Sequence, residues 1–418
     1  MSAASYYPKF RWFVLLALWF ITVTEGIILI SFAPLIGVIA SQLGLSLGEA
    51  TGAFMGAFTL FVTVGAVAGG AFVDRVGAVP VFIASCVLMF LGDILIPTFS
   101  DSFPALVALR IIEGVGAGAI MGVGSAVAAV WFPEAERGLV LGIQGLSVSL
   151  GIAIGFGTVP AVFEATGSWT TAMAWLAVAP VIGLLLSMVV AFGPKPPAED
   201  SSVAACDLSS SSDFKLALKQ PVTYIGILCI FFLSWIMQAF NDLTPAYLAI
   251  NPPIGIGYGP VAAGKYMMVV QIAFMIGSVV GSLAMQKIFK GVVKPVVMIG
   301  FIMAGIFCLS IKFPFVHGNP VVLVPFLFIA GFFQGWVNPN VQAFCAMHYP
   351  AHIVGKLGGM WMGLGILGGT AGVVAGSVAL HTTGAYQVSI IIVALIAVVG
   401  VGCTVFLNPP KVFCSGNK

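Results

Sequence analysis

The sequence predicts an all-α integral membrane protein of about twelve membrane-spanning helices, arranged as two similar six-helix bundles. Three observations predict this fold: the composition, a series of long apolar segments, and an internal repeat. Of the 418 residues, 60% are hydrophobic and 7% are charged. A water-soluble domain carries about 25% charged residues, so lipid must be the solvent for most of this surface. The net charge of +2 gives no indication of a nucleic-acid partner.

Twelve apolar segments are long enough to cross the membrane, since about 20 helical residues span its hydrocarbon core. Charged residues and Pro- or Gly-rich stretches separate the segments. Their approximate ranges are 11–40, 49–72, 80–98, 104–132, 138–163, 169–193, 221–250, 260–286, 293–312, 320–347, 354–381 and 385–407. The N-terminus runs directly into the first segment without a small-residue cleavage site, so we expect this segment to be retained.

One long polar stretch, 194–220, lies almost at the midpoint and is rich in Ser, Pro and Lys. Such a composition is typical of a flexible linker. The predicted domains are therefore an N-terminal six-helix bundle (1–193), a cytoplasmic linker (194–220), a C-terminal six-helix bundle (221–407) and a cytoplasmic tail (408–418).

Lysines and arginines are distributed unevenly between the two sides of the predicted membrane. Thirteen of the sixteen fall on the side of both termini and the linker, Lys312 falls on the other side, and Arg110 and Lys265 lie within spans. Cytoplasmic loops carry an excess of Lys and Arg, so both termini are expected to be cytoplasmic. The short termini and short linker favour a multi-pass protein of a bacterial inner membrane.

The second half repeats the first. Moving the fourth and fifth segments forward by 217 positions superposes eight glycine, proline and isoleucine residues on identical ones. Ile112, Gly114, Gly118, Pro133, Gly138, Gly142, Gly151 and Gly155 fall on Ile329, Gly331, Gly335, Pro350, Gly355, Gly359, Gly368 and Gly372. Parallel repeats of six helices place a solute site between the halves, near the midplane of the membrane.

Six ionisable residues lie inside predicted spans: Glu25, Asp93, Arg110, Glu113, Asp242 and Lys265. A charge at the bilayer centre costs about 2.5–3.5 kcal/mol on insertion scales, so each is a functional hypothesis. Glu25 lies in the middle of the first span, where a carboxyl group could take up and release a proton. The alternative for Glu25 is a hydrogen-bonded acid that only stabilises the bundle.

Arg110 and Glu113 have the i, i+3 spacing that lets side chains pair on one helix face. The favoured interpretation is a structural ion pair that anchors the fourth helix to the first and third, with Asp93 as a further partner. In the alternative, Arg110 contacts an anionic solute, or the pair opens during transport with Glu113 as a proton carrier.

The seventh segment contains the polar sequence Gln238-Ala-Phe-Asn241-Asp242-Leu-Thr-Pro245. Pro245 cannot donate a backbone hydrogen bond to residue 241, so a kink is expected there. A kinked polar segment suits a gate or a binding site, with Asp242 as a second proton-coupling candidate. Lys265 begins the next helix near the same predicted depth and could neutralise Asp242.

The tenth segment carries several amides within nine residues of an apolar span. They and the tryptophan between them are Gln334, Trp336, Asn338, Asn340 and Gln342. Such groups can line a wet cavity and bind a polar solute, and Gln271 in the eighth segment is a weaker candidate of the same kind. The alternative is hydrogen bonding between helices, which contributes about 0.6 kcal/mol per bond on average.

No metal or cofactor site is expected. The seven cysteines are isolated from one another, the four histidines do not form a ligand cluster, and no Walker-type phosphate loop is present. ATP-driven transport by this chain alone is therefore not expected.

Three motifs resemble those of the major facilitator superfamily. Gly69-Gly-Ala-Phe-Val-Asp74-Arg75-Val-Gly77 is similar to its signature between helices 2 and 3, although Ala78 and Val79 replace the usual basic pair. Arg110-Ile-Ile-Glu-Gly114 resembles its helix 4 signature, and Pro133-Glu-Ala-Glu-Arg137-Gly138 resembles the following loop. The resemblance implies that Asp74 helps to close the cytoplasmic side, with Arg75 and Arg137 as further gating candidates. The antiporter signature expected in helix 5 is poorly matched around Gly155 and Pro160.

These observations favour a secondary transporter, not an enzyme, that moves a small polar organic solute by alternating access. Proton-coupled symport through Glu25, Asp242 or Glu113 is the leading mechanism, with the amide residues as solute contacts and a monomer in the bilayer as the working unit. The alternatives are efflux by proton antiport, transport of an organic anion through Arg110 and Lys265, a membrane-embedded enzyme, and a receptor or scaffold.

Overall fold

The computed structural model describes residues 8–195, 207–410 and 412. Within these ranges every regular element is a helix, and twelve helical segments are long and apolar enough to cross a membrane. The predicted all-α membrane fold with twelve spans is confirmed. The spans are Arg11–Leu43, Leu47–Val73, Ala78–Phe99, Phe103–Trp131, Leu139–Thr166, Trp169–Phe192, Pro221–Ala249, Gly259–Lys287, Val293–Ser310, Pro320–His348, Ile353–Thr383 and Tyr386–Val405.

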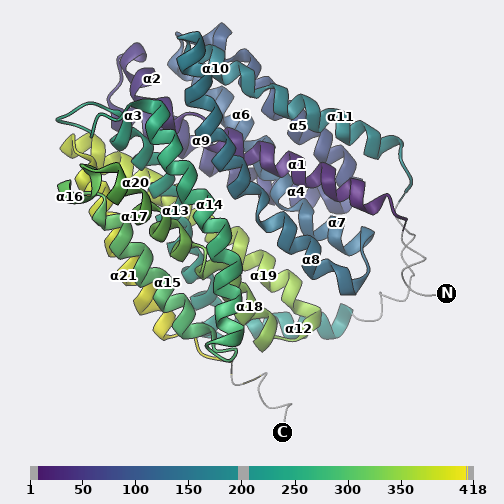
Figure 1. Cartoon of the computed structure of the whole chain (residues 1–418). Coiled ribbons are helices and arrows are strands. Elements are labelled where there is room, and N and C mark those ends of the chain that lie inside the picture. Colours follow the sequence, from purple (N-terminus) through teal and green to yellow (C-terminus); the bar gives the residue numbers. More distant parts are fainter. Residues whose placement is uncertain (1–7, 196–206, 411, 413–418) are drawn as a thin grey trace. The chain divides into compact units, whose positions relative to one another are not determined.

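Most spans consist of two helical elements joined by a short irregular turn, and Figure 1 labels them. The first six spans contain α1 (Arg11–Ile30), α2 (Ile36–Leu43), α3 (Leu47–Thr51), α4 (Ala57–Val76), α5 (Ala78–Leu95), α6 (Phe103–Met121), α7 (Val123–Trp131), α8 (Glu134–Gly145), α9 (Ser147–Thr166), α10 (Trp169–Leu176) and α11 (Val178–Phe192). The rest of the chain contains α12 (Asp207–Leu218), α13 (Pro221–Ala249), α14 (Gly259–Lys287), α15 (Val293–Ser310), α16 (Pro314–His317), α17 (Pro320–Gln334), α18 (Val337–His348), α19 (Ala351–Gly365), α20 (Leu367–Thr383) and α21 (Tyr386–Val405).

The region predicted as a flexible linker contains the helix α12. Apolar residues explain why it folds: Ala217 is buried, and the Phe214 ring lies 4.7 Å from the Lys356 ammonium group on α19. A cation above an aromatic face is a favourable contact even near water. The predicted flexible linker thus contains a helix at Asp207–Leu218, and its role as the connection between two bundles stays a prediction.

Two compact units divide the chain by their internal contacts. The first comprises Met1–Glu199 and Pro245–Met268, and the second comprises Asp200–Thr244 and Val269–Lys418. In the first unit α4 and α5 pack on α6, and α1 packs on α9; in the second, α15 packs on α17 and α21. The predicted domains are consecutive sets of six spans, whereas these units are defined by internal contacts. The predicted domain boundaries therefore stay a prediction.

The sequence repeat of 217 positions reappears in the helix boundaries of the two units. α6 begins at Phe103 and α17 at Pro320, and α9 ends at Thr166 while α20 ends at Thr383. Each of the latter two helices is followed by a glycine in the left-handed conformation with φ of 68°. The same local structures therefore recur at the same offset.

Close helix packing recurs at the same offset. A Cβ atom on Gly118 of α6 would collide with the carbonyl oxygen of Val62 on α4. A Cβ atom on Gly335, after α17, would collide with the Phe274 carbonyl oxygen on α14 in the same way. Glycines at such positions let helix backbones approach closely, which is a main source of helix association in lipid.

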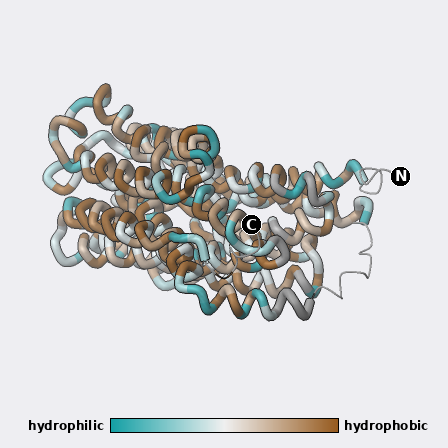
Figure 2. The backbone as a smooth tube through the Cα atoms, turned by 90° about the horizontal axis from the view of Figure 1, so that it is seen from below, coloured by the Kyte–Doolittle hydropathy of each residue, from teal (hydrophilic) through white to brown (hydrophobic). Residues whose placement is uncertain are grey.

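Hydrophobic residues follow the length of most helices, whereas hydrophilic residues are more frequent at helix ends and connections, as Figure 2 shows. Many large apolar side chains are exposed. On α14 the exposed residues Ile272, Ile276, Val279 and Leu283 recur every three or four positions and form one stripe. Such a stripe is expected to face lipid tails.

Candidate functional site

Arg110 of α6 belongs to the first unit and is completely buried. Its Nη1 donates to the Oε2 of Glu113 at 2.6 Å, and its Nε donates to the carbonyl oxygen of Phe54 at 3.2 Å. The rings of Phe32 and Phe58 enclose the guanidinium, with centroids 4.5 and 4.2 Å from its Cζ. These contacts hold the guanidinium between an acid, a backbone carbonyl group and two aromatic rings.

Two further bonds of Arg110 stabilise the end of α1. That helix ends at Ile30, a short 3-10 turn containing Pro34 follows, and α2 resumes at Ile36. Such a break leaves carbonyl groups of the last helical turn without backbone donors. Arg110 adds donors at this end: Nη2 lies 3.4 Å from the Leu29 oxygen, and Nη1 lies 3.2 Å from the Ile28 oxygen, which also accepts from the backbone N–H of Ser31. The geometry supports the structural interpretation of Arg110 over a solute contact.

Asp93 of α5 joins this arrangement. Its carboxyl group is fully buried and lies within electrostatic range of Glu113 and Arg110, although neither of its oxygens has a hydrogen-bond partner in the described structure. Gly92 makes room for the pair, since a Cβ atom there would collide with the Glu113 side chain. Asp93 and Glu113 thus place two carboxyl groups beside one guanidinium, as the sequence analysis proposed for Asp93.

Glu25 of α1 is fully buried. Within the described part of the chain, neither of its carboxyl oxygens has a hydrogen-bond partner. Burying an ionised carboxylate without a partner costs several kcal/mol. The surroundings of Glu25 therefore fit the neutral acid, which is the form that a proton-carrying group takes when loaded.

A second polar group lies on α13 and α14, in the second unit. Asn241, Asp242 and Gln271 are 0–1% exposed. The Nε2 of Gln271 donates to the Oδ1 of Asn241 at 2.8 Å, and the Nε2 of Gln238 donates to the Oδ2 of Asp242 at 2.9 Å. The structure thus pairs Asn241 with Gln271 across two helices, whereas Gln238 and Asp242 pair along α13 itself. Lys265 belongs to the first unit, and its pairing with Asp242 stays a prediction.

Unused polar atoms remain in the amide pair. Among the described residues, the Nδ2 of Asn241 and the Oε1 of Gln271 have no hydrogen-bond partner. Buried amide groups are normally satisfied, and an unsatisfied one costs about 1–3 kcal/mol. A free donor and a free acceptor at one buried position are therefore candidates for contact with a ligand.

The amides of the tenth span are mostly engaged in packing. Gln334 donates to the Sγ of Cys308 on α15 at 3.3 Å, and Asn340 donates to the Trp336 carbonyl oxygen at 2.6 Å. The Trp336 ring itself lies against Gly281 of α14. Gln334 and Trp336 therefore contact neighbouring helices, whereas the bond of Asn340 lies within its own span. Asn338 is only half-buried, and its Oδ1 has no partner in the described structure.

Lys265 of α14 is exposed. It lies seven and eleven positions before Ile272 and Ile276, so it continues their exposed stripe along the same helix face. Lysine side chains near a membrane boundary extend their ammonium group toward the headgroups. This position favours an anchoring role for Lys265 over a solute contact.

The gating candidates lie near the ends of α4 and α7. Arg75 is exposed, and the Asp74 side chain lies outside the described structure, although its backbone continues α4. Arg137 donates to the carbonyl oxygens of Ala129 at 2.7 Å and Phe132 at 3.1 Å. Arg137 therefore satisfies orphan carbonyl groups at the end of α7.

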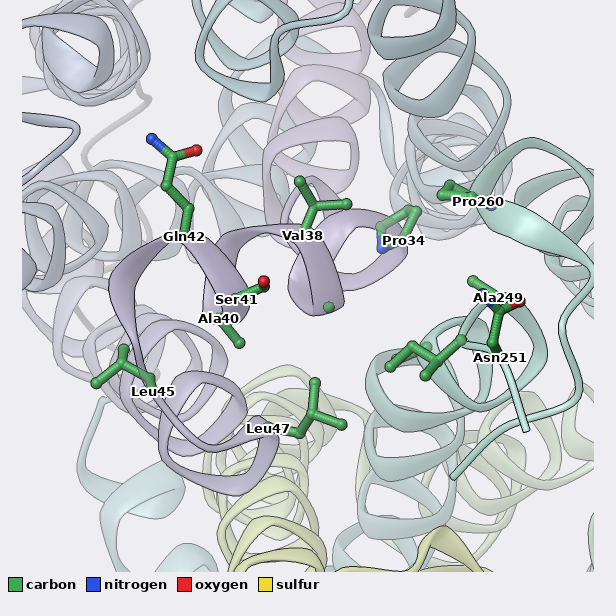
Figure 3. Close-up of a pocket in the computed structure, with 13 residues that line it drawn as sticks. Pro34, Val38, Ala40, Ser41, Gln42, Leu45, Leu47, Ala249, Asn251 and Pro260 are labelled. Atoms are coloured by element: carbon green, nitrogen blue, oxygen red, sulfur yellow. The ribbon is translucent and has the colours of Figure 1, made fainter. Parts of the chain in front are cut away.

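One cavity was not predicted from the sequence. It measures about 700 Å³, lies within the first unit, and is lined by residues of α2 and by residues around the end of α13. Figure 3 shows Ser41 and Val38 on one side of it and Asn251 on another. The described residues that line the cavity include no charged residue and none of the predicted site residues. Its walls come from segments that are far apart in the sequence, so no local pattern could indicate it.

Comparisons with known proteins agree with this architecture. The sequence model of the Major Facilitator Superfamily matches residues 18–314 and 289–412. A probable sulfoacetate transporter, SauU of Cupriavidus necator, is 25% identical over 95% of this chain and 93% of its own length. The oxalate:formate antiporter of Oxalobacter formigenes is 28% identical over 35% of each chain. An uncharacterised transporter of the same superfamily, YfiU of Bacillus subtilis, is 30% identical over 38% of this chain, and the match spans only 30% of YfiU.

Solved structures show the same fold. A bacterial homologue of the human lysosomal transporter Spinster, in its inward-facing occupied conformation, superposes with a TM-score of 0.76 at 13% identity. The alignment covers 96% of this chain and 97% of the homologue. The unoccupied inward-facing form gives a TM-score of 0.74. Together with the family match, this agreement confirms the resemblance and excludes the membrane-enzyme alternative: the chain belongs to the Major Facilitator Superfamily of multi-pass membrane transporters.

Proposed function

We propose that this chain is a secondary transporter that moves a small organic anion by alternating access, in symport with protons. The sequence alone favoured a small polar organic solute in general. Two relatives narrow that class, because one is named for sulfoacetate and the other for oxalate and formate. The first of them aligns with nearly the whole chain, which supports the same solute class here.

The observation that carries the coupling mechanism is the state of Glu25. It is a fully buried acid in the first span, with both oxygens unbonded in the described structure. Such a site accommodates the neutral acid and releases a proton only when the surroundings change. A change of surroundings is what alternating access supplies.

Energetics explain why an anion transporter would use protons. Moving one negative charge into a cell against an inside-negative potential costs about 2.3 kcal/mol per 100 mV. One proton carried with each charge cancels that cost and adds the pH gradient as a driving force. Glu25 is the foremost carrier, and Asp242 and Glu113 stay further candidates.

Several other assignments belong to the same proposal. The protein acts as a monomer in a bacterial inner membrane, with both termini in the cytoplasm. Asp74, Arg75 and Arg137 help to close the cytoplasmic side. Among the solute contacts proposed from the sequence, the leading candidates are Gln238, Asn241 and Gln271. Asn338 is the next candidate.

Uptake into proteoliposomes tests the proposal. Purified protein is reconstituted, and accumulation of radiolabelled sulfoacetate, oxalate and formate is compared with that of a neutral sugar and an amine. We expect accumulation of at least one anion when the outside is acidic, and its loss when a protonophore removes the gradient. Accumulation of only the neutral sugar or the amine would overturn the assignment of the solute class.

Anion exchange is a second candidate, favoured by the likeness to an antiporter over about a third of the chain. Proteoliposomes loaded with unlabelled anion distinguish the two mechanisms. Exchange predicts uptake that requires internal anion and ignores the pH gradient, whereas symport predicts uptake into empty vesicles.

A further inference from the structure

We propose that Asn241 and Gln271 bind the carboxylate or sulfonate group of the solute through neutral amide N–H donors. This inference rests on the proposed transport of an organic anion and adds the site at which the anion is recognised. Neither residue carries a charge, so the site differs in kind from the arginine and lysine site that the sequence suggested.

The geometry of the amide pair leaves donors available. Gln271 uses one of the two hydrogens on Nε2 for the Oδ1 of Asn241, at 2.8 Å. The Nδ2 of Asn241 has no partner in the described structure. One N–H group from each residue can therefore point to a shared acceptor, as the two oxygens of a carboxylate or sulfonate require. The bond between the amides holds both side chains in place for this contact.

The two cations that the sequence places inside spans are engaged in other contacts. Arg110 is enclosed by two aromatic rings and bonded to Glu113 and to backbone carbonyl groups. Lys265 continues the exposed apolar stripe of α14. An anion that reaches the second unit thus meets amide dipoles, which are stronger partners in a medium of low dielectric constant than in water. A neutral site also releases its cargo more readily than a buried cation would, as transport requires.

Asp242 is the nearest acid in sequence and does not occupy the same face of α13. Successive residues of a helix are turned by about 100° from one another. Asn241 is bonded to α14, whereas Asp242 accepts from Gln238 on its own helix. The amide pair therefore remains available to an anion although an acid adjoins it in the chain.

The position of the pair couples binding to movement of the backbone. Asn241 lies four residues before Pro245, which has no N–H group to give to the Asn241 carbonyl oxygen. The chain passes into the first unit at Pro245 and leaves it after Met268, three residues before Gln271. The hydrogen bond between Asn241 and Gln271 thus joins α13 and α14 at the base of the segment 245–268. A solute bound there acts at the point where that segment can bend.

Two isosteric substitutions test the site. Asn241→Asp and Gln271→Glu keep the side-chain shape but replace the amide donors with carboxyl oxygens. Asn319→Asp is the matched control, because the side-chain oxygen of Asn319 caps α17 by accepting from the Val321 N–H, and an aspartate can do the same. Binding of sulfoacetate and oxalate to each purified, full-length variant is measured by calorimetry in detergent, after its melting temperature without ligand has been compared with that of the wild type.

We expect the two site variants to bind the anion at least about tenfold more weakly, as for loss of one strong hydrogen bond. The control variant should keep the affinity of the wild type. If the acidic variants fail to fold, Gln271→Met removes the amide without adding charge. The affinity of that variant for the anion then tests the amide site. Affinity within twofold of the wild type in the folded site variants would overturn the amide site.

The wild-type protein separates this failure from a failure of the proposed function. If it binds an anion and the site variants bind equally well, only the amide site is wrong. If it binds none of the organic anions and binds a neutral solute, the proposed solute class is wrong. The proposed anion site at the amide pair is then wrong as well.

Discussion

Arg110 and Glu113 form an ion pair one turn apart on α6, with 2.6 Å between Nη1 and Oε2 and neither side chain exposed. The pair does more than neutralise charge, since the same guanidinium bonds the Ile28 and Leu29 carbonyl groups where α1 breaks. Arg110 thus connects the fourth span to the irregular end of the first. We therefore expect substitution of Arg110 to lower the stability of the protein.

Arg110→Ala should destabilise the protein by about 3–5 kcal/mol, because it leaves the Glu113 carboxylate buried without its partner. Thermal unfolding in detergent measures the loss. The double variant Arg110→Met with Glu113→Leu should recover part of it, since the uncompensated charge is then absent. A well-folded Arg110→Ala protein that has lost only solute binding would return Arg110 to the list of solute contacts.

Glu25→Gln should abolish accumulation driven by a pH gradient while the protein stays folded, because the amide matches the neutral acid in shape but cannot release a proton. Exchange of labelled for unlabelled solute across the same vesicles should continue. Gradient-driven accumulation at the wild-type level would remove Glu25 from the coupling mechanism.

Gly118→Ala and Gly335→Ala should each lower stability by about 1–3 kcal/mol, the usual cost of forcing extra atoms into packed regions. In both cases the new methyl group meets a carbonyl oxygen of the facing helix. Gly363→Ala in α19 is the control, because its Cβ would meet nothing within 4 Å. There the change should be neutral or stabilising by up to about 1 kcal/mol. Equal effects at all three positions would argue against close packing at the repeated glycines.

Lys265→Gln should leave the affinity for the solute and the maximal transport rate within twofold of the wild type, because the side chain continues an exposed apolar stripe. Initial rates of uptake over a range of solute concentrations measure both quantities. A tenfold rise in the apparent KM for an anion, with no rise for Asn241→Asp, would favour the cationic site over the amide site.

Asn338→Ala and Asn340→Ala should affect different properties, the first the apparent affinity for the solute and the second the stability. Asn340→Ala removes the bond to the Trp336 carbonyl oxygen and should lower the melting temperature. Asn338→Ala should lower the apparent affinity for the solute with little change in stability, because Asn338 is half-buried and its Oδ1 is unbonded in the described structure. Unchanged affinity in Asn338→Ala would assign the whole polar group of the tenth span to packing.

The number of spans and the repeat could be predicted because they depend on local and periodic properties of the sequence. The proximity of Arg110 and Glu113 followed from helix geometry alone. The enclosure of Arg110 by Phe32 and Phe58 could not be predicted, because it depends on how three spans pack together. The same limitation affected the tenth span: residue types indicated a polar surface, but the rotation of the helix turns Gln334 toward Cys308.

The helix boundaries that recur at an offset of 217 also bear on biosynthesis. Each copy of the repeat brings its own glycine contacts, such as Gly118 with Val62 and Gly335 with Phe274. The second set of contacts therefore does not need the first to be completed. Two polypeptides separated within residues 196–206 should each insert their own spans. Co-expression supplies the first unit with its segment Pro245–Met268 and should yield a functional transporter.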